Sequence, residues 1–173
     1  YEREQVVSVC GNITQNTLWN ADTVKLTCNI VINNGITLTI NPKVYVESQG
    51  HYSITVNGRI VANANATDSI IFTAKNISTG WAGIIFNSTP AGNDTSKFSF
   101  CRFNYSKNTS LNGGALNVTN FSKIKITNSL FKNNEALNGG AIYAYNSSFS
   151  VSNSGFRNNT ANNYGAALYC GSN

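Results

Sequence analysis

The stretch Phe131-Lys-Asn-Asn-Glu-Ala-Leu-Asn-Gly-Gly-Ala-Ile142 decides the fold of this chain, because both of its ends recur in the sequence. Its Gly-Gly-Ala-Ile end occurs 26 residues earlier as Gly113-Gly-Ala-Leu116 and 26 residues later as Gly165-Ala-Ala-Leu168. A fixed period of this size is typical of repeat proteins, in which each repeat is one structural unit stacked on the next. About 26 residues therefore form one unit of the fold.

The other end of the stretch is a Phe that follows an apolar residue five positions earlier, and this pattern recurs as well. The three pairs are Phe98 and Phe103, Ile126 and Phe131, and Val151 and Phe156. The distance from the Phe to the next Gly varies between eight and ten residues. Two elements of fixed form, separated by a loop of variable length, describe one coil of a solenoid.

The residues around each Gly pair alternate with a period of two, which is typical of strands rather than helices. In the second repeat, Ile142 and Ala144 would point one way and Tyr143 the other. Stacking at the observed period would place Leu116, Ile142 and Leu168 in one inward column. The sequence thus predicts a β-solenoid.

The Gly pair and the Phe-X-X-Asn motif are expected at the corners of each coil. Gly tolerates a positive φ and the close approach of another backbone, both of which a sharp turn between sheets requires. In Phe131-Lys-Asn-Asn134 and Phe156-Arg-Asn-Asn159, Phe would fill the core. Asn adopts the left-handed conformation readily and can stack amide on amide between coils. Ser106 takes the Asn position in the preceding coil, so that corner is expected to be looser.

Residues 23–86 form a less regular series of alternating apolar segments, separated by turn signals such as Asn33-Asn34-Gly35 and Asn57-Gly58. We interpret them as early coils. Residues 1–22 are expected to form an N-terminal cap or assembly segment with Trp19 closing the core, because a first coil otherwise exposes strand edges. The predicted organisation is a cap at 1–22 and a parallel β-helix over 23–173, with regular coils from about residue 96 onward.

In alternation, the Gly-Gly-Ala-Ile/Leu and Phe-X-X-Asn motifs resemble the repeats of polymorphic outer-membrane adhesins and, more broadly, right-handed parallel β-helix repeat proteins of microbial surfaces. The segments 35–42, 54–62 and 80–86 are similar to the N-terminal part of the broader group. The resemblance implies an all-β, right-handed parallel β-helix with a secreted or surface-anchored role in adhesion or matrix building. Ala166, which replaces the second Gly, and Ser106 depart from the pattern.

Charged residues make up only 11% of the chain, against roughly 25% in an ordinary soluble domain. The net charge is +5, but the basic residues are spread almost evenly along the sequence. Nucleic-acid binders concentrate such charge beside aromatic platforms, so no nucleic-acid partner is predicted. No apolar run approaches the roughly 18 residues that a membrane span needs, and no span is expected.

Eleven Asn residues begin an Asn-X-Ser/Thr sequence, about twice as many as chance placement gives. These candidate N-glycosylation sites are Asn12, Asn65, Asn76, Asn87, Asn93, Asn104, Asn108, Asn117, Asn120, Asn146 and Asn158. The side chains of Asn117 and Asn158 are expected to face outward. The excess predicts an exported glycoprotein, secreted or at the cell surface. The alternative is that the repeat template creates these sequences by accident.

The four Cys residues are an even number, which fits an oxidising compartment. Cys10 and Cys28 are expected to form a disulfide that joins the cap to the first coil. Cys170 falls in the inward column and is interpreted as a small apolar core residue. The partner of Cys101 stays open.

No catalytic site, metal site or cofactor is predicted. Polysaccharide enzymes with this fold need two nearby carboxylates or clustered calcium ligands. The acidic residues here are scattered, and the only close pair is Glu2 and Glu4 near the N-terminus. His51 is the single His, in a segment that reads as a solvated turn.

The sequence predicts a non-catalytic extracellular structural or adhesive module of a surface or matrix protein, with end-to-end assembly into filaments as a further option. The alternative is a polysaccharide-binding or polysaccharide-cleaving β-helix. Tyr143, Tyr145 and Tyr169 would lie on an outer face, either as a sugar or partner contact or as ordinary outward residues. Expected partners are other copies or further coils of a longer chain, covalent N-glycans, and a carbohydrate or cell-surface ligand.

Overall fold

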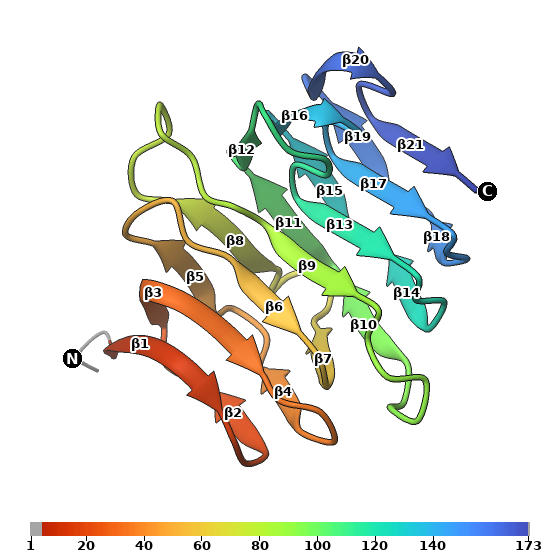
Figure 1. The fold of residues 1–173 in the computed structure, drawn as a ribbon. Coiled ribbons are helices and arrows are strands. Elements are labelled where there is room, and N and C mark those ends of the chain that lie inside the picture. Colours follow the sequence, from red (N-terminus) through yellow and green to blue (C-terminus); the bar gives the residue numbers. More distant parts are fainter. Residues whose placement is uncertain (1–4, 173) are drawn as a thin grey trace.

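The computed structural model describes residues 5–172, and these residues form coils of short parallel strands stacked along one axis (Figure 1). No helix occurs within this range. Every strand pair of the described part is parallel, and each strand pairs with the equivalent strand of the next coil. The parallel β-solenoid predicted from the sequence is confirmed.

The strands form three faces, which we name A, B and C, and a short sheet at the corner between A and B. Face A contains the first part of β3 (Thr23–Ile32) with β5 (Tyr45–Ser48), β8 (Ile70–Ala74), β11 (Cys101–Asn104), β15 (Leu130–Lys132) and β19 (Gly155–Arg157). Face B contains the second part of β3 with β6 (Ile54–Val56), β9 (Ile84–Asn87), β13 (Leu116–Thr119), β17 (Ile142–Tyr145) and β21 (Leu168–Gly171). Face C contains β2 (Thr17–Trp19), β4 (Thr37–Ile40), β7 (Arg59–Asn63), β10 (Ser96–Ser99), β14 (Ile124–Thr127) and β18 (Ser150–Ser152). The corner sheet consists of β12 (Lys107–Asn108), β16 (Glu135–Asn138) and β20 (Thr160–Tyr164).

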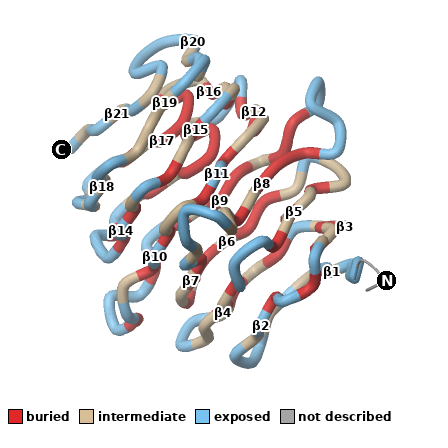
Figure 2. Tube along the Cα trace, turned by 180° about the vertical axis from the view of Figure 1, so that it is seen from behind, coloured by how far each residue is buried: buried red, intermediate tan, exposed pale blue. Residues whose placement is uncertain are grey.

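The predicted column on face B is present. Leu116 pairs with Ile142, and Ile142 pairs with Leu168. Leu116 and Ile142 are fully buried, whereas Leu168 is 41% exposed. Figure 2 shows that β21, the last strand of face B, has no buried segment. Cys170 pairs with Ala144 in the neighbouring inward column, yet it is exposed rather than a core residue. The register was predicted correctly, but burial depends on a rung on both sides.

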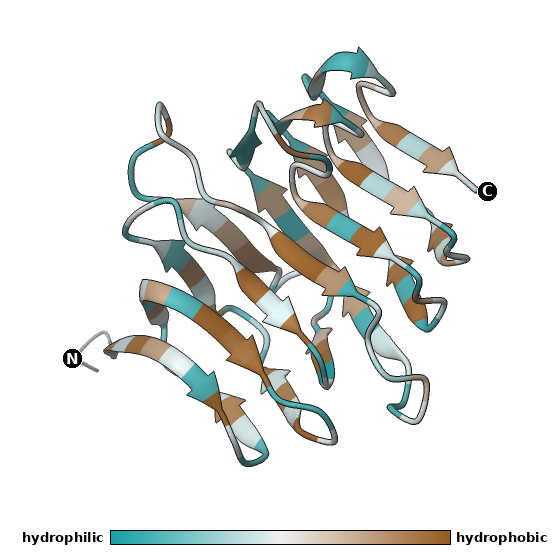
Figure 3. Cartoon of the chain, viewed as in Figure 1, coloured by the Kyte–Doolittle hydropathy of each residue, from teal (hydrophilic) through white to brown (hydrophobic). Residues whose placement is uncertain are grey.

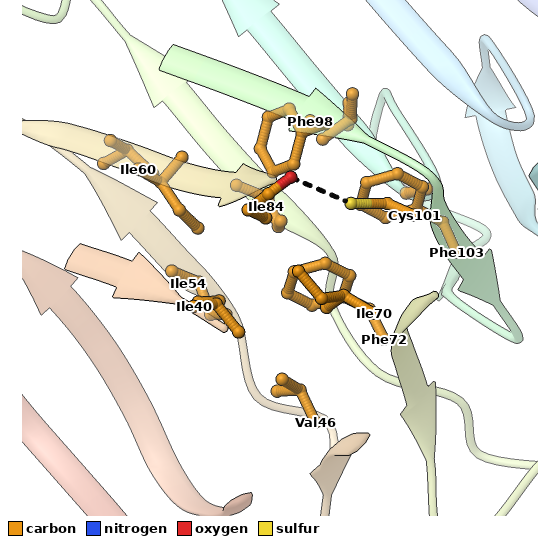
Figure 4. Packing of buried hydrophobic residues seen from close by; sticks show 14 of the residues in the cluster. Ile40, Val46, Ile54, Ile60, Ile70, Phe72, Ile84, Phe98, Cys101 and Phe103 are labelled. Atoms are coloured by element: carbon orange, nitrogen blue, oxygen red, sulfur yellow. Dashed lines mark hydrogen bonds between the residues drawn. The ribbon is translucent and has the colours of Figure 1, made fainter. Parts of the chain in front are cut away.

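Large apolar side chains stack from coil to coil in the core. On face A the rings of Phe72, Phe103, Phe131 and Phe156 lie nearly parallel, with successive centroids 5.0, 4.6 and 5.1 Å apart. Figure 4 shows Phe72, Phe98 and Phe103 packed among Ile residues that come from all three faces. Along the strands, apolar inward residues alternate with polar outward residues (Figure 3), as period-two patterning requires.

A ladder of polar side chains holds the corner between faces A and B. Asn133 and Asn158 adopt positive φ, as expected for Asn at a corner. Asn134 and Asn159, the next residues in the chain, stack on each other. Asn134 Nδ2 donates to Asn159 Oδ1 at 2.9 Å and to the Phe103 carbonyl at 3.0 Å.

The expectation of a looser corner at Ser106 was wrong. Ser106 is fully buried, and its hydroxyl donates to Asn134 Oδ1 at 2.8 Å. Its backbone N–H also donates to that oxygen, so the hydroxyl terminates the Asn ladder instead of breaking it.

The two glycines of each motif have separate roles. The first, such as Gly139, has a φ of 64°, in the left-handed region. The second has no room for a side chain, because a Cβ on Gly140 would lie 2.2 Å from the Ala166 carbonyl oxygen of the next coil. Ala166, which takes the position of the second glycine in the last repeat, is exposed.

The N-terminal segment joins the same sheets. β1 (Val6–Ile13) pairs in parallel with β3, and β2 pairs with β4. Trp19 at the end of β2 is buried, as expected of a residue that closes the core. Residues 6–19 thus form a first rung, while residues 1–4 of the predicted cap lie outside the described range.

We expect Asn134→Ala to lower the free energy of unfolding by about 2–4 kcal/mol, because it leaves the buried Ser106 N–H unpaired and removes the side-chain hydrogen bonds to the Phe103 carbonyl and to Asn159. Urea unfolding followed by circular dichroism measures the change. Asn163→Ala, at an exposed position of β20, is the control and should stay within about 0.5 kcal/mol of the parent. Equal losses in the two variants would contradict a structural role of the ladder.

Candidate functional site

Three carboxylates of the described residues form ion pairs at separate places. The N–O distances are 3.4, 3.7 and 3.8 Å for Asp68 with Lys43, Asp94 with Arg59, and Glu135 with Lys107, respectively. No group of three His, Cys, Asp or Glu side chains that could hold a metal occurs within residues 5–172. Glu2 and Glu4 lie outside these residues.

Two shallow hollows contain Asp22, Glu47 and His51, the other carboxylates and the single His of the described residues. Asp22 and Glu47 line one together with Lys25 and Lys43. There the Asp22 carboxylate accepts a hydrogen bond from the Gln5 backbone N–H at 2.6 Å. His51 lines the other, where its Nε2 lies 2.6 Å from the Lys107 carbonyl oxygen. This exposed position fits the predicted solvated turn.

Tyrosine rings gather on the outer side of face B. Tyr143 and Tyr169 stack with centroids 5.1 Å apart, and Tyr143 and Tyr145 are 6.3 Å apart. Partial burial, followed by the neighbouring Tyr169 and Tyr145, raises the pKa of Tyr143. Tyr164 of β20, which the sequence did not single out, adds a tilted ring 6.4 Å from Tyr169. Mutual stacking explains these rings structurally, so a sugar or partner contact at Tyr143, Tyr145 and Tyr169 stays a prediction.

Cys10 and Cys28 form the predicted disulfide, which links β1 to β3. Cys101 is a buried free thiol, and it donates to the Ala62 carbonyl at 3.3 Å (Figure 4). Burial strongly raises the pKa of the Cys101 thiol, so the thiolate needed for nucleophilic chemistry is suppressed. Cys101 is therefore a core residue.

Most of the candidate glycosylation sites are on the surface. The exposed ones are Asn12, Asn65, Asn76, Asn87, Asn120, Asn146 and Asn158. Asn104 and Asn117 are half-buried, and Asn117 points outward as predicted, between buried Leu116 and Val118. Asn158, also outward as predicted, is at the positive-φ corner position.

The fold buries two of the predicted glycosylation sites, Asn93 and Asn108, and burial argues against a glycan at either. Asn93 is 8% exposed, and its Nδ2 donates to Asn34 Oδ1 and to the carbonyls of Asn57 and Pro90. Asn108 is 6% exposed, and its Nδ2 donates to the Ala82 and Gly113 carbonyls. A glycan on either nitrogen would break these bonds and would have no space.

Comparison with known proteins shows that one segment of the chain is similar to a known repeat. Residues 128–145 match the Chlamydia polymorphic membrane protein repeat. This segment contains Phe131, Asn134 and the Gly139-Gly140 pair, the residues that build the aromatic stack, the amide ladder and the sharp corner. Residues 128–145 are thus similar to a repeat of those membrane proteins. No curated protein and no solved structure is detectably similar to it. Residues 5–172 contain no helix of the length and apolarity that a membrane crossing requires.

When the chain is expressed in a secretory host that N-glycosylates, we expect glycans at exposed sites such as Asn12, Asn87 and Asn158. Asn93 and Asn108 should stay unmodified in folded material because their amides are buried. Peptide mass mapping before and after enzymatic glycan removal measures occupancy at each site. A glycan on Asn93 or Asn108 in monomeric folded protein would contradict the arrangement of the Asn93 loop or of β12.

Proposed function

We propose that this chain is a non-catalytic extracellular module of a surface protein, with a structural or adhesive role. The observation that carries the proposal is the match of residues 128–145 to a membrane-protein repeat, at the residues that stack one coil on the next. A rigid solenoid of this kind holds its outer faces at fixed spacing from any anchor. That geometry suits adhesion or matrix building.

Two further features support an extracellular location. The Cys10–Cys28 disulfide is of a kind that persists in oxidising compartments. Seven of the sequon Asn residues are exposed, as attachment of a glycan requires. Neither feature depends on the repeat match.

The arrangement of the acidic and His side chains supports a non-catalytic role. Asp22 and Glu47 line one hollow, but Asp22 accepts a hydrogen bond from the Gln5 backbone N–H and Glu47 accepts one from Gln49 Nε2. The Asp68, Asp94 and Glu135 carboxylates each lie beside a cation, and His51 is exposed with its Nε2 at a backbone carbonyl. Glycoside cleavage needs two carboxylates that act on one bond. Binding without cleavage, to a carbohydrate or a cell-surface ligand, is the activity that these faces support best.

We also propose that the ends of the solenoid are covered in the assembled protein, by further coils of a longer chain or by other copies. Val6 and Val7 on the first rung are 49% and 41% exposed, and Leu168 on the C-terminal rung is 41% exposed. Exposed strand edges next to apolar side chains favour the addition of another strand. Residues 6–9 already pair with β3 of their own chain. A second copy would therefore stack its end on this complete first rung, and no free N-terminal strand would be exchanged between copies.

An antibody raised against the folded chain should label intact cells of the native source as strongly as permeabilised cells. Protease treatment of intact cells should remove the signal, because a surface module is accessible from outside. An antibody against a cytoplasmic protein of the same cells is the control. Labelling that needs permeabilisation would overturn the extracellular proposal.

If copies cover one another's ends, the purified chain should sediment as concentration-dependent oligomers. Leu168→Lys should shift these toward monomer, because it places a charge on the contacting rung. Leu111→Lys, at an exposed loop position away from the ends, is the control. A monomer at all concentrations would exclude assembly between copies and leave further coils of the same chain as the cover.

A further inference from the structure

The basic residues of the later coils gather on two of the three faces. Lys97, Arg102, Lys125, Lys132 and Arg157 occupy outward positions of β10, β11, β14, β15 and β19, and all five are exposed. None of these strands contains an acidic residue. The ion pairs within residues 5–172 involve other cations, namely Lys43, Arg59 and Lys107.

The strands of face B carry no charge. β6, β9, β13, β17 and β21 contain no Lys, Arg, His, Asp or Glu. Most of the positive charge of the later coils therefore lies on faces A and C, which meet at the turns between β10 and β11, β14 and β15, and β18 and β19. The two other cations of these coils are engaged elsewhere: Lys107 pairs with Glu135 at the corner sheet, and Lys123 donates to the Ala91 and Asn93 carbonyls.

Like charges are stacked directly on adjacent coils. Lys97 pairs in register with Lys125 on face C, and Lys132 pairs with Arg157 on face A. Side chains on adjacent rungs are only about 4.8 Å apart, so these pairs repel each other. The coil before has neutral residues at the same positions: Val61 opposite Lys97, and Asn104 opposite Lys132. The fold does not require cations there, and the residues described supply no counter-charge.

From these observations we infer that the outer surfaces of faces A and C in the last three coils bind an acidic polysaccharide, with Lys97, Arg102, Lys125, Lys132 and Arg157 as the contact residues. The inference deepens the proposed adhesive role by naming the class of ligand. A linear polyanion relieves the repulsion between stacked cations, since its carboxylate or sulfate groups lie between them. Arg adds forked hydrogen bonding to such groups.

The rest of this surface favours a polysaccharide over a nucleic acid. On face C, the column beside Lys97 and Lys125 consists of hydroxyls, and Thr127 Oγ1 donates to Ser99 Oγ at 3.0 Å. Hydroxyls and cations on a flat sheet match the hydroxyl and anionic groups of an acidic sugar polymer. No outward position of β10, β11, β14, β15 or β19 is aromatic, whereas single-stranded nucleic acids are bound by stacking on aromatic rings.

The test compares two triple variants with the same change of net charge, from +5 to +2. One carries Lys97→Gln, Lys125→Gln and Lys132→Gln. The control carries Lys25→Gln, Lys43→Gln and Lys75→Gln on the earlier coils. Binding to immobilised heparin, to hyaluronan, to neutral dextran and to oligodeoxythymidine is measured by surface plasmon resonance at low and physiological salt.

We expect the parent chain to bind heparin or hyaluronan but not dextran, with affinity that falls as salt screens the charges. The first triple variant should lose at least about tenfold in affinity, and the control less than about threefold. The thermal midpoint of the first triple variant should be equal to or above that of the parent, because the repulsion between stacked lysines has been removed. This measurement separates lost binding from lost folding.

Three outcomes would overturn the inference: equal losses in the two triple variants, which indicate attraction by net charge alone; no binding of the parent to either acidic polysaccharide; and tighter binding to oligodeoxythymidine than to both. Surface labelling of intact cells combined with any of these results would leave the extracellular module standing without this ligand. The two proposals therefore fail separately.

Discussion

Every part of this structure depends on one constraint: each coil is paired, residue by residue, with the coil on either side of it. In a parallel ladder the backbone groups of one rung bond to the next, so equivalent residues stack at a spacing of about 4.8 Å. A side chain must therefore tolerate its own equivalent as a neighbour. Phe does so by ring stacking, as Phe103 does on Phe131, and Asn does so by amide bonding, as Asn134 does with Asn159. At the tightest point only Gly meets the requirement, because the carbonyl of the next coil occupies the place of a Cβ.

The same constraint explains the composition. A charged residue in such a column faces a like charge above or below it whenever the template is kept, and that repulsion destabilises the stack. Polar residues without charge avoid this cost, which accounts for a chain with only 11% charged residues. Loops escape the constraint, and two of the three ion pairs of the described residues, Lys43 with Asp68 and Arg59 with Asp94, involve residues at turns or loops. Stacked Lys and Arg on faces A and C are exceptions for which the packing gives no reason.

The repeated motifs explain what could be predicted from the sequence and what could not. The Leu116, Ile142 and Leu168 column follows directly from a 26-residue period. The burial of Asn93 could not be predicted in this way. It depends on contacts with Asn34 and Asn57 in the loops of two earlier coils, and no sequence period relates those residues to Asn93. The basic surface was missed for a different reason. Lys97 and Lys125 are 28 positions apart, and Lys132 and Arg157 are 25 apart. Both separations are close to the length of one coil, so residues that are evenly spaced in the sequence lie on top of one another in the structure. Comparing the spacing of the cations with the repeat period would have revealed it.

Function in this architecture has to reside on outward positions and loops, because the inward positions are fixed by stacking. Face B and faces A and C use that freedom in opposite ways. Face B carries stacked Tyr rings without charge, whereas faces A and C carry cations at successive rungs. A surface built from one group repeated at a fixed interval makes weak contacts individually, and it gains affinity only for a ligand that presents its own groups repeatedly. A polymer meets that condition and a small molecule does not, which is why the ligand proposed above is a polysaccharide. The stacking that stabilises the solenoid is thus also the argument for a repetitive ligand.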